Sequence, residues 1–398
     1  MYEIGFVDIC VSIGFILIGI VLRKIAKKTW PTLPINVVTS FVLFHTALAL
    51  AYFKMSTTIM LADATVYFEK ATNSPNDWSA ILDLGNGAIN IIIYPLIHWF
   101  GFGYLSCFLV FNAMGIIGAL LLYAETRSYL TSLKAKKLYN YLLFIPGMSF
   151  WTCALGKDSM VILGLGLALS SFHKLKQRWL RMLLGMIITV YVRPHIFIVI
   201  VITAAIWFLL NPNKSVKQVV IKTVLFLVFS AIFLSTYSLI LDYAGFRADL
   251  SVGNLQTYLE FRQTINEGTS TVDITQYSVL GKYLTYLFRP LFFDAKNMLM
   301  ILASFENLIL VYLLIQVFRP KHIKVLFLKK NLYTRFHIIY FFLGLTMLAL
   351  TTGNLGIAVR QKTMILPSFL VVTVKIISDG YEMRKKRATP KDIPLLES

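Results

Sequence analysis

Long apolar runs recur along this chain and are separated mainly by short basic loops. Of its 398 residues, 57% are hydrophobic and only 14% are charged, whereas about a quarter of a soluble domain is charged. A membrane-spanning helix needs roughly 20 mostly apolar residues. Lipid offers the backbone no hydrogen-bond partners, and these runs lack the alternation of barrel strands. The sequence therefore predicts an all-α polytopic integral membrane protein.

The apolar runs predict about eleven transmembrane helices and one short interfacial or re-entrant helix. The predicted spans lie near 5–22, 36–53, 104–123, 137–153, 158–173, 180–192, 195–211, 217–237, 297–317, 335–351 and 361–378. The stretch 88–100 is apolar but short and carries Pro95, so we expect it to lie at the outer face.

The distribution of charge predicts the orientation of the chain. Placing alternate basic loops in the cytoplasm puts 27 of the 38 Lys and Arg inside, but only 5 of the 19 Asp and Glu. This is the positive-inside pattern, with the N-terminus outside and the C-terminus in the cytoplasm. The net charge of +19 then indicates topology and anionic membrane lipid rather than nucleic acid.

The same pattern predicts the domain organisation. We expect one transmembrane catalytic domain over 1–378, with long outer loops near 54–103 and 238–296, and a basic cytoplasmic tail over 379–398. The three cysteines are widely separated, which gives no metal-binding spacing and no disulfide framework. No cofactor is predicted; a divalent metal is chemically compatible with the outer carboxylates but is not indicated.

Seven charged or titratable groups lie at or near the outer ends of apolar runs. They are Asp63, Lys157, Asp158, Arg193, His195, Arg289 and Arg360. Ionisable groups at membrane depth are costly, so they are functional candidates by default. The cations suit phosphate, and the carboxylates suit acid/base chemistry.

Each of these residues also has a structural interpretation. Asp63 could accept a proton, hold a metal or cap a helix. Lys157 and Asp158 could contact phosphate or form the tip of a helical hairpin. Arg193 and His195 flank a proline that breaks the chain, but an arginine there could simply snorkel to the interface.

The last part of the chain supplies further candidates. Glu306 lies inside a predicted span and needs a cationic partner, for which we expect an arginine of the outer cluster. Asn354 lies between two glycines that let backbone approach a ligand closely. Arg360 follows and presents a planar fork that fits phosphate.

The common signatures of soluble enzymes are missing, including the nucleotide-binding P-loop and the His-Glu-x-x-His zinc motif. A transferase working outside the membrane without ATP must use an activated donor. A lipid-linked phosphate or pyrophosphate sugar is the natural donor class.

With these residues considered, the chain resembles Wzy-type O-antigen and exopolysaccharide polymerases and related polysaccharide-locus membrane proteins. It is more distantly similar to C-type glycosyltransferases. The matching pieces are Asp63-Ala-x-x-Tyr67, Phe150-Trp-x-x-x-x-Gly-Lys-Asp158, Arg193-Pro-His195, Phe288-Arg-Pro290 with Ser304-Phe-Glu-Asn307, and Gly353-Asn354 with Arg360.

The resemblance implies an enzyme of the bacterial cytoplasmic (inner) membrane that joins sugars at the outer leaflet. It implies a catalytic role for Asp63 and binding of the pyrophosphate by Arg193, Arg289 and Arg360. From the residues themselves we add Asp158 and His195 as catalytic candidates. We also add Lys157, Asn354, Tyr67 and Glu306 as substrate-binding candidates. The substrate would be a polyprenyl-pyrophosphate-linked oligosaccharide, and a chain-length regulator or flippase of the same pathway would be a partner.

Two alternatives remain open on the sequence. One is a C-type transferase that adds a single sugar. The other is a lipid-linked oligosaccharide flippase or another transporter, in which charged groups would be distributed through a central cavity reachable from both sides.

Overall fold

The computed structural model describes residues 2, 4–29, 33–58, 62–74, 87–210, 220, 270–326 and 331–388. The predicted span 217–237, residues 238–269 of the second outer loop and residues 389–398 of the tail lie essentially outside this part of the chain. The described part is all-helical, as predicted. Its only β-type pairing is an isolated bridge between Thr271 and Asn354.

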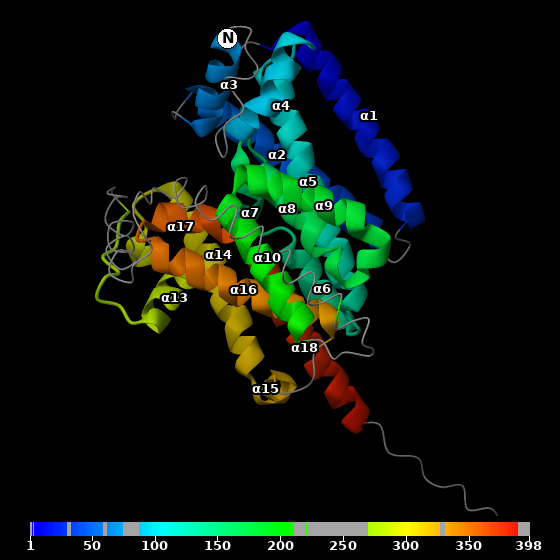
Figure 1. The fold of residues 1–398 in the computed structure, drawn as a ribbon, viewed down its shortest axis with the longest axis vertical. Coiled ribbons are helices and arrows are strands. Elements are labelled where there is room, and N and C mark those ends of the chain that lie inside the picture. Colours follow the sequence, from blue (N-terminus) through cyan, green and yellow to red (C-terminus); the bar gives the residue numbers. More distant parts are fainter. Residues whose placement is uncertain are drawn as a thin grey trace, which may run out of the picture.

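Figure 1 shows the described helices in chain order. They are α1 (Phe6–Thr29), α2 (Ile35–Thr58), α3 (Asp63–Asn73), α4 (Gly87–His98), α5 (Tyr104–Tyr129), α6 (Leu133–Leu142), α7 (Pro146–Thr152), α8 (Lys157–Leu169), α9 (Leu175–Val192), α10 (Pro194–Leu209), α13 (Val279–Phe288), α14 (Met298–Phe318), α15 (Pro320–Leu326), α16 (Leu332–Thr351), α17 (Leu355–Gln361) and α18 (Leu366–Ala388). Short 3-10 turns lie at Phe172–Lys174 (η2), Phe292–Asp294 (η3) and Lys362–Met364 (η4).

The number of membrane spans differs from the sequence prediction. Among the described residues, four helices are long and apolar enough to cross a membrane: α2, α5, α14 and α16. Two bent pairs raise the number to at most six: Pro146–Thr152 with Lys157–Val192, bent by 107°, and Leu355–Met364 with Leu366–Lys385, bent by 64°. The described residues therefore provide four to six candidate spans, fewer than the eleven predicted, and the predicted span 217–237 lies almost entirely outside them.

Breaks inside the apolar runs explain the difference. The run 137–153 is divided before Pro146 into α6 and α7, because proline cannot continue a helix. The runs 158–173 and 180–192 become α8, with 13 residues, and α9, with 18. Neither forms an independent span, because α7, α8 and α9 fold together within one bent segment.

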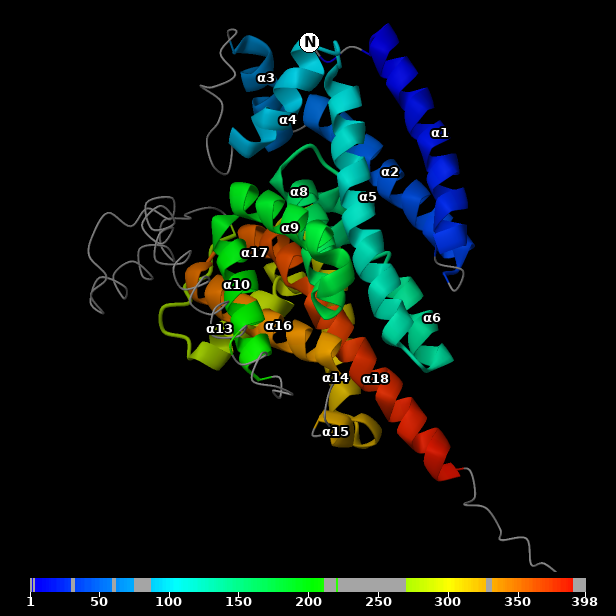
Figure 2. The same ribbon diagram turned by 45° about the vertical axis from the view of Figure 1, so that its right-hand side comes forward.

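The predicted outer loops and tail also contain helices. The stretch predicted as an interfacial helix forms α4, which has Pro95 inside it and packs on α3. The described end of the second loop forms α13. The first ten residues of the predicted tail, 379–388, belong to α18, which continues to Ala388 (Figure 2).

Close backbone contacts hold α5, α8 and α9 together. A Cβ atom on Gly166 of α8 would overlap the backbone of Gly118 on α5, and one on Gly185 of α9 would overlap the backbone of Gly164 on α8. Small residues allow such approaches and are typical of helix interfaces in membranes. This packing fixes the start of α8, where Lys157 and Asp158 lie.

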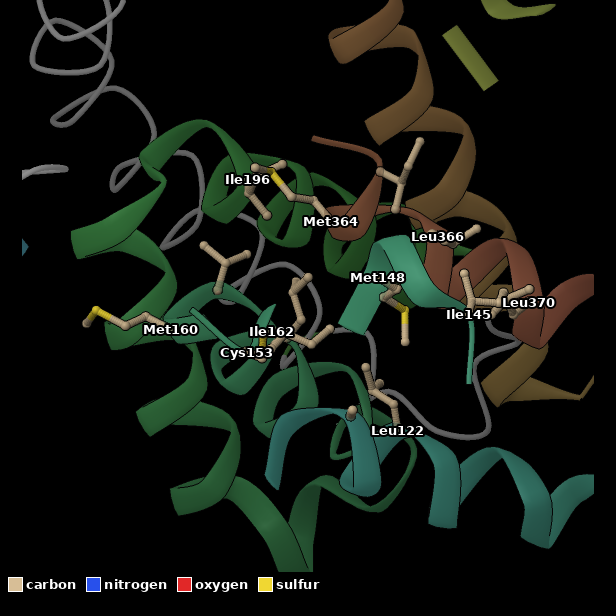
Figure 3. Packing of buried hydrophobic residues seen from close by; sticks show 14 of the residues in the cluster. Leu122, Ile145, Met148, Cys153, Met160, Ile162, Ile196, Met364, Leu366 and Leu370 are labelled. Atoms are coloured by element: carbon tan, nitrogen blue, oxygen red, sulfur yellow. The ribbon is translucent and has the colours of Figure 1, made fainter. Parts of the chain in front are cut away.

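An apolar core fills the space where α5, α7, α8 and α18 meet (Figure 3). Leu122 of α5, Met148 of α7, Ile162 of α8 and Leu370 of α18 are all buried there. One buried charge ties α1 to this assembly: the Asp8 carboxylate accepts hydrogen bonds from the backbone and side chain of Ser106, in the first turn of α5.

Candidate functional site

Four charged side chains that are far apart in the sequence meet at one place. Asp63 opens α3, Asp158 lies in the first turn of α8, Arg193 joins α9 to α10, and Arg360 lies in α17. We call these four residues the ionic cluster. Each stands at a helix end or in a short helix, because the chain breaks at these points between longer apolar segments.

Arg360 connects the two carboxylates of the ionic cluster. Its Nη1 lies 2.6 Å from Asp63 Oδ2, and its Nε donates to Asp158 Oδ2. Arg193 Nη2 lies 3.6 Å from Asp158 Oδ1. One guanidinium therefore bridges two carboxylates that are 95 positions apart in the sequence, and a second guanidinium flanks the inner one.

The two carboxylates differ in their access to solvent. The Asp158 side chain is 3% exposed, whereas that of Asp63 is 56% exposed. Asp158 therefore orients the two arginines from inside the protein. Asp63 is the carboxylate that an incoming ligand can reach.

Aromatic side chains surround Arg360. The indole of Trp151 lies under its guanidinium, with the ring centroid 5.7 Å from Cζ, a cation–π geometry. Tyr52 and Tyr67 are buried, and both interact electrostatically with Arg360 and Asp63. Burial, and after it the nearby Asp63 carboxylate, raises the pKa of Tyr67 to about 12. Tyr67 is therefore a neutral phenol at physiological pH.

Lys157 and His195 lie beside residues of the ionic cluster. Lys157 precedes Asp158, is partly buried and interacts electrostatically with all four cluster residues. With Lys157 included, three cations face two carboxylates, so the site carries one net positive charge. His195 lies in the first turn of α10, two positions after Arg193, and is partly buried. Its role stays a prediction.

Two other predicted residues have local structural partners. The Asn354 side-chain oxygen caps α17 by accepting from the backbone N–H groups of Gly356 and Ile357, at 2.9 and 3.2 Å. Arg289 makes a two-point ion pair with Asp294, at 3.0 Å from Nε to Oδ2 and 2.5 Å from Nη2 to Oδ1. The guanidinium of Arg289 is thus paired with Asp294 rather than with Asp63 or Asp158.

Glu306 has a different partner from the one predicted. It is buried in α14, and the cation that acts on it is Lys362 rather than an arginine of the ionic cluster. Lys362 is itself buried and donates to Asn307 Oδ1 at 2.6 Å and to the backbone carbonyls of Leu287 and Arg289 at 3.1 and 3.2 Å. The predicted arginine is not among the charges that act on Glu306, because this side chain packs against Gly147 of α7, where Lys362 is the nearby cation.

Sequence reasoning missed Lys362, Trp151 and Asp294 as members of these networks. The sequence contains one feature that could have identified Lys362: it is an ionisable residue at the edge of an apolar run. The contact of Trp151 with Arg360 had no such signal, because it depends on how α7 and α17 pack.

The ionic cluster combines two chemical capabilities. Guanidinium groups bind phosphate oxygens through paired hydrogen bonds, and a reachable carboxylate can accept a proton. Among the described residues no group of three or more His, Cys, Asp or Glu side chains is placed to hold a metal ion.

The residues that the structure describes thus form an all-helical protein with apolar helices suited to a membrane and an ionic cluster built from four separate segments. Compared with protein-family models, curated proteins and solved structures, the chain matches none of them.

Proposed function

We propose that this protein transfers glycosyl groups from a polyprenyl-pyrophosphate-linked donor at the outer leaflet of the bacterial cytoplasmic membrane. In this proposal it polymerises oligosaccharide repeat units into a surface polysaccharide. The observation that carries the proposal is the bridging of Asp63 and Asp158 by Arg360, with Arg193 and Lys157 close by.

In the proposed reaction the cations bind the pyrophosphate of the donor. The bond from the anomeric carbon to the pyrophosphate oxygen breaks, and Arg360, Arg193 and Lys157 stabilise the negative charge that develops there. A hydroxyl oxygen of the acceptor sugar forms the new bond to the anomeric carbon. Its proton passes to Asp63, the more exposed carboxylate.

The ion pairs suggest how binding and proton transfer are linked. A pyrophosphate competes with Asp63 for the Nη1 face of Arg360, because both offer oxygen acceptors to the same donor. Displacement of Asp63 leaves its carboxylate free to meet the acceptor hydroxyl. Asp158 keeps its contact with Nε of Arg360 and holds the guanidinium in place.

The apolar core supports a transferase over a transporter. A second ionic group lies at the other end of α5 and α8, where Glu125 contacts His173 and Arg178 at 2.6 Å each. Between this group and the ionic cluster the described residues pack as the buried core of Figure 3. A flippase is expected instead to line its central cavity with polar groups.

The proposed orientation places the N-terminus and the ionic cluster outside and the basic segment Lys174–Arg181 in the cytoplasm, following the positive-inside rule. A chain-length regulator or flippase of the same pathway would act with the protein. Basic loops facing the cytoplasm would contact anionic lipid rather than nucleic acid.

The test is the profile of lipid-linked glycans in cells that carry Arg360→Ala, Arg193→Ala or Asp63→Asn, resolved by gel and mass spectrometry. We expect the ladder of polymer lengths to disappear and one lipid-linked repeat unit to accumulate, while the protein remains in the membrane. Lys70→Ala is the matched control, because Lys70 is exposed on the same helix as Asp63.

Two outcomes would contradict the polymerase. An intermediate that is short by one sugar would indicate a single-sugar transferase, because only one addition would be missing. Full-length polymer in both arginine variants would show that the ionic cluster is not the site of glycosyl transfer.

A further inference from the structure

A second binding feature lies between α10 and α16, away from the ionic cluster. It is a groove with a cavity of about 360 Å³, lined by Trp207, Leu210, Arg335, Ile338 and Ile339. Pockets that hold small ligands have volumes of about 300–1,000 Å³. Four of the five lining residues are apolar, and Arg335 is the single charged one.

The groove begins where the C-terminal end of α10 is held beside the start of α16, and it continues along α16. The Trp207 indole donates to the backbone carbonyl of Leu332 at 2.7 Å, which holds the end of α10 beside the start of α16. From Arg335 the α16 face continues through Ile338 and Ile339 to Phe342, whose side chain is 55% exposed. At 1.5 Å per residue this stripe is about 10 Å long, with its cation at one end.

Arg335 is available to a ligand. Among the residues that the structure describes, no carboxylate forms an ion pair with its guanidinium, in contrast to Arg178, Arg193, Arg289 and Arg360. An unpaired guanidinium beside an apolar groove is complementary to one kind of molecule: an anionic head joined to an apolar chain.

We propose that this groove binds an anionic phospholipid, with the headgroup phosphate on Arg335 and one acyl chain along Ile338, Ile339 and Phe342. Basic side chains between membrane helices bind the anionic headgroups of such lipids by electrostatic attraction. The indole of Trp207 lies at the head end, where tryptophan side chains commonly contact the membrane interface. This site does not depend on the proposed glycosyl transfer.

The alternatives fit the groove less well. A zwitterionic phospholipid carries its own ammonium group, which weakens the attraction of its phosphate to Arg335. Free phosphate would satisfy the cation but leave the apolar wall of the groove uncovered. A second copy of the chain would have to supply both a carboxylate and an apolar ridge to the same place.

The experiment uses the full-length protein in neutral detergent and counts bound lipids by native mass spectrometry. Phosphatidylglycerol and phosphatidylcholine with the same acyl chains are the two probes. We expect tighter binding of phosphatidylglycerol, and a loss of about fivefold in its affinity on Arg335→Ala. Arg335→Lys should retain most of the preference because the charge remains. Ile339→Trp should lower occupancy by both lipids because it fills the groove.

Arg319→Ala is the matched control, because Arg319 is an exposed cation at the end of α14 and does not line the groove. An unchanged phosphatidylglycerol preference in Arg335→Ala, or an equal loss in Arg319→Ala, would overturn the proposal. So would displacement of the lipid by millimolar glycerol phosphate, which has no acyl chain. A change of oligomeric state in Arg335→Ala with lipid binding intact would assign the groove to a second copy of the chain instead.

Discussion

Asp63 and Asp158 share one guanidinium but differ in burial, and this difference separates their roles. The pair formed by Asp63 is open to solvent, and such pairs contribute only about 0–1 kcal/mol to stability. The pair formed by Asp158 is buried, and removal of one partner from a buried pair costs about 3–5 kcal/mol. Replacement of the two residues should therefore give different patterns of loss.

We expect Asp63→Asn to lose chain growth while its thermal midpoint stays close to that of the wild type. Asp158→Asn should lower the thermal midpoint, because Arg360 and Arg193 both lose their buried partner. Thermal unfolding of the purified proteins, compared with the glycan ladder in cells, measures both effects. Equal loss of stability in the two variants would mean that Asp63 is a structural residue.

The ion pair of Arg289 and Asp294 predicts a dependence on pH. The Arg289 guanidinium lowers the pKa of the Asp294 carboxyl group below its ordinary value. The pair therefore stabilises the folded protein above the unfolded pKa of about 4, and this stability is lost as the pH falls through the folded value.

We expect Asp294→Asn to be less stable than the wild type by about 1 kcal/mol near pH 7, with the difference shrinking near pH 3. Thermal midpoints of both proteins at the two pH values give the measurement. A difference that stays constant across this range would show that the Asp294 charge is not its source.

At the scale of elements, glycine contacts decide how closely α5, α8 and α9 pack. Gly166 lies against the backbone of Gly118, so even a methyl group there requires the helices to separate. Gly14 on α1 has open space where its Cβ would be. The two positions therefore make a matched pair within apolar helices.

Gly166→Ala should lower the thermal midpoint and reduce chain growth, because movement of α8 shifts Asp158 relative to Arg360. Gly14→Ala should leave chain growth unchanged and gain up to about 1 kcal/mol from its helix propensity. Thermal unfolding and the glycan ladder are the two readouts. A neutral Gly166→Ala would show that α5 and α8 tolerate a wider separation.

At the scale of the whole molecule, one buried network joins distant segments. Lys362 binds Asn307 of α14 and the carbonyls that end α13, and its charge acts on Glu306. Asn307 also donates to the carbonyl of Pro290 at 2.7 Å. Residues about 55–75 positions apart in the sequence are thus held together next to α17, which carries Arg360.

Lys362→Met should lower the stability by about 3–5 kcal/mol, because it leaves Glu306 buried without a cation. Adding Glu306→Gln should recover part of that loss, which a double-mutant cycle measures as a coupling between the two positions. Additive losses in the cycle would mean that Lys362 stabilises the fold only through Asn307 and the carbonyls.

The sequence by itself determined the helical class of this protein and which residues lie at the breaks between its apolar runs. Both follow from local properties: continuous apolar stretches, and proline or charged residues that interrupt them. Asp63, Asp158, Arg193 and Arg360 were identified in this way, although their spacing along the chain says nothing of how near they lie to each other.

Only the tertiary structure decided which apolar runs of the described residues form one continuous helix, and which partner each charge in the described networks has. Hydropathy counts apolar runs but does not reveal that α7, α8 and α9 fold together as one bent segment. In the same way, charge alone suggested an arginine for Glu306 and a shared cluster that included Arg289. In the structure Lys362 is the cation that acts on Glu306, and Asp294 forms the ion pair with Arg289. The packing of the helices determines which of these side chains come close together.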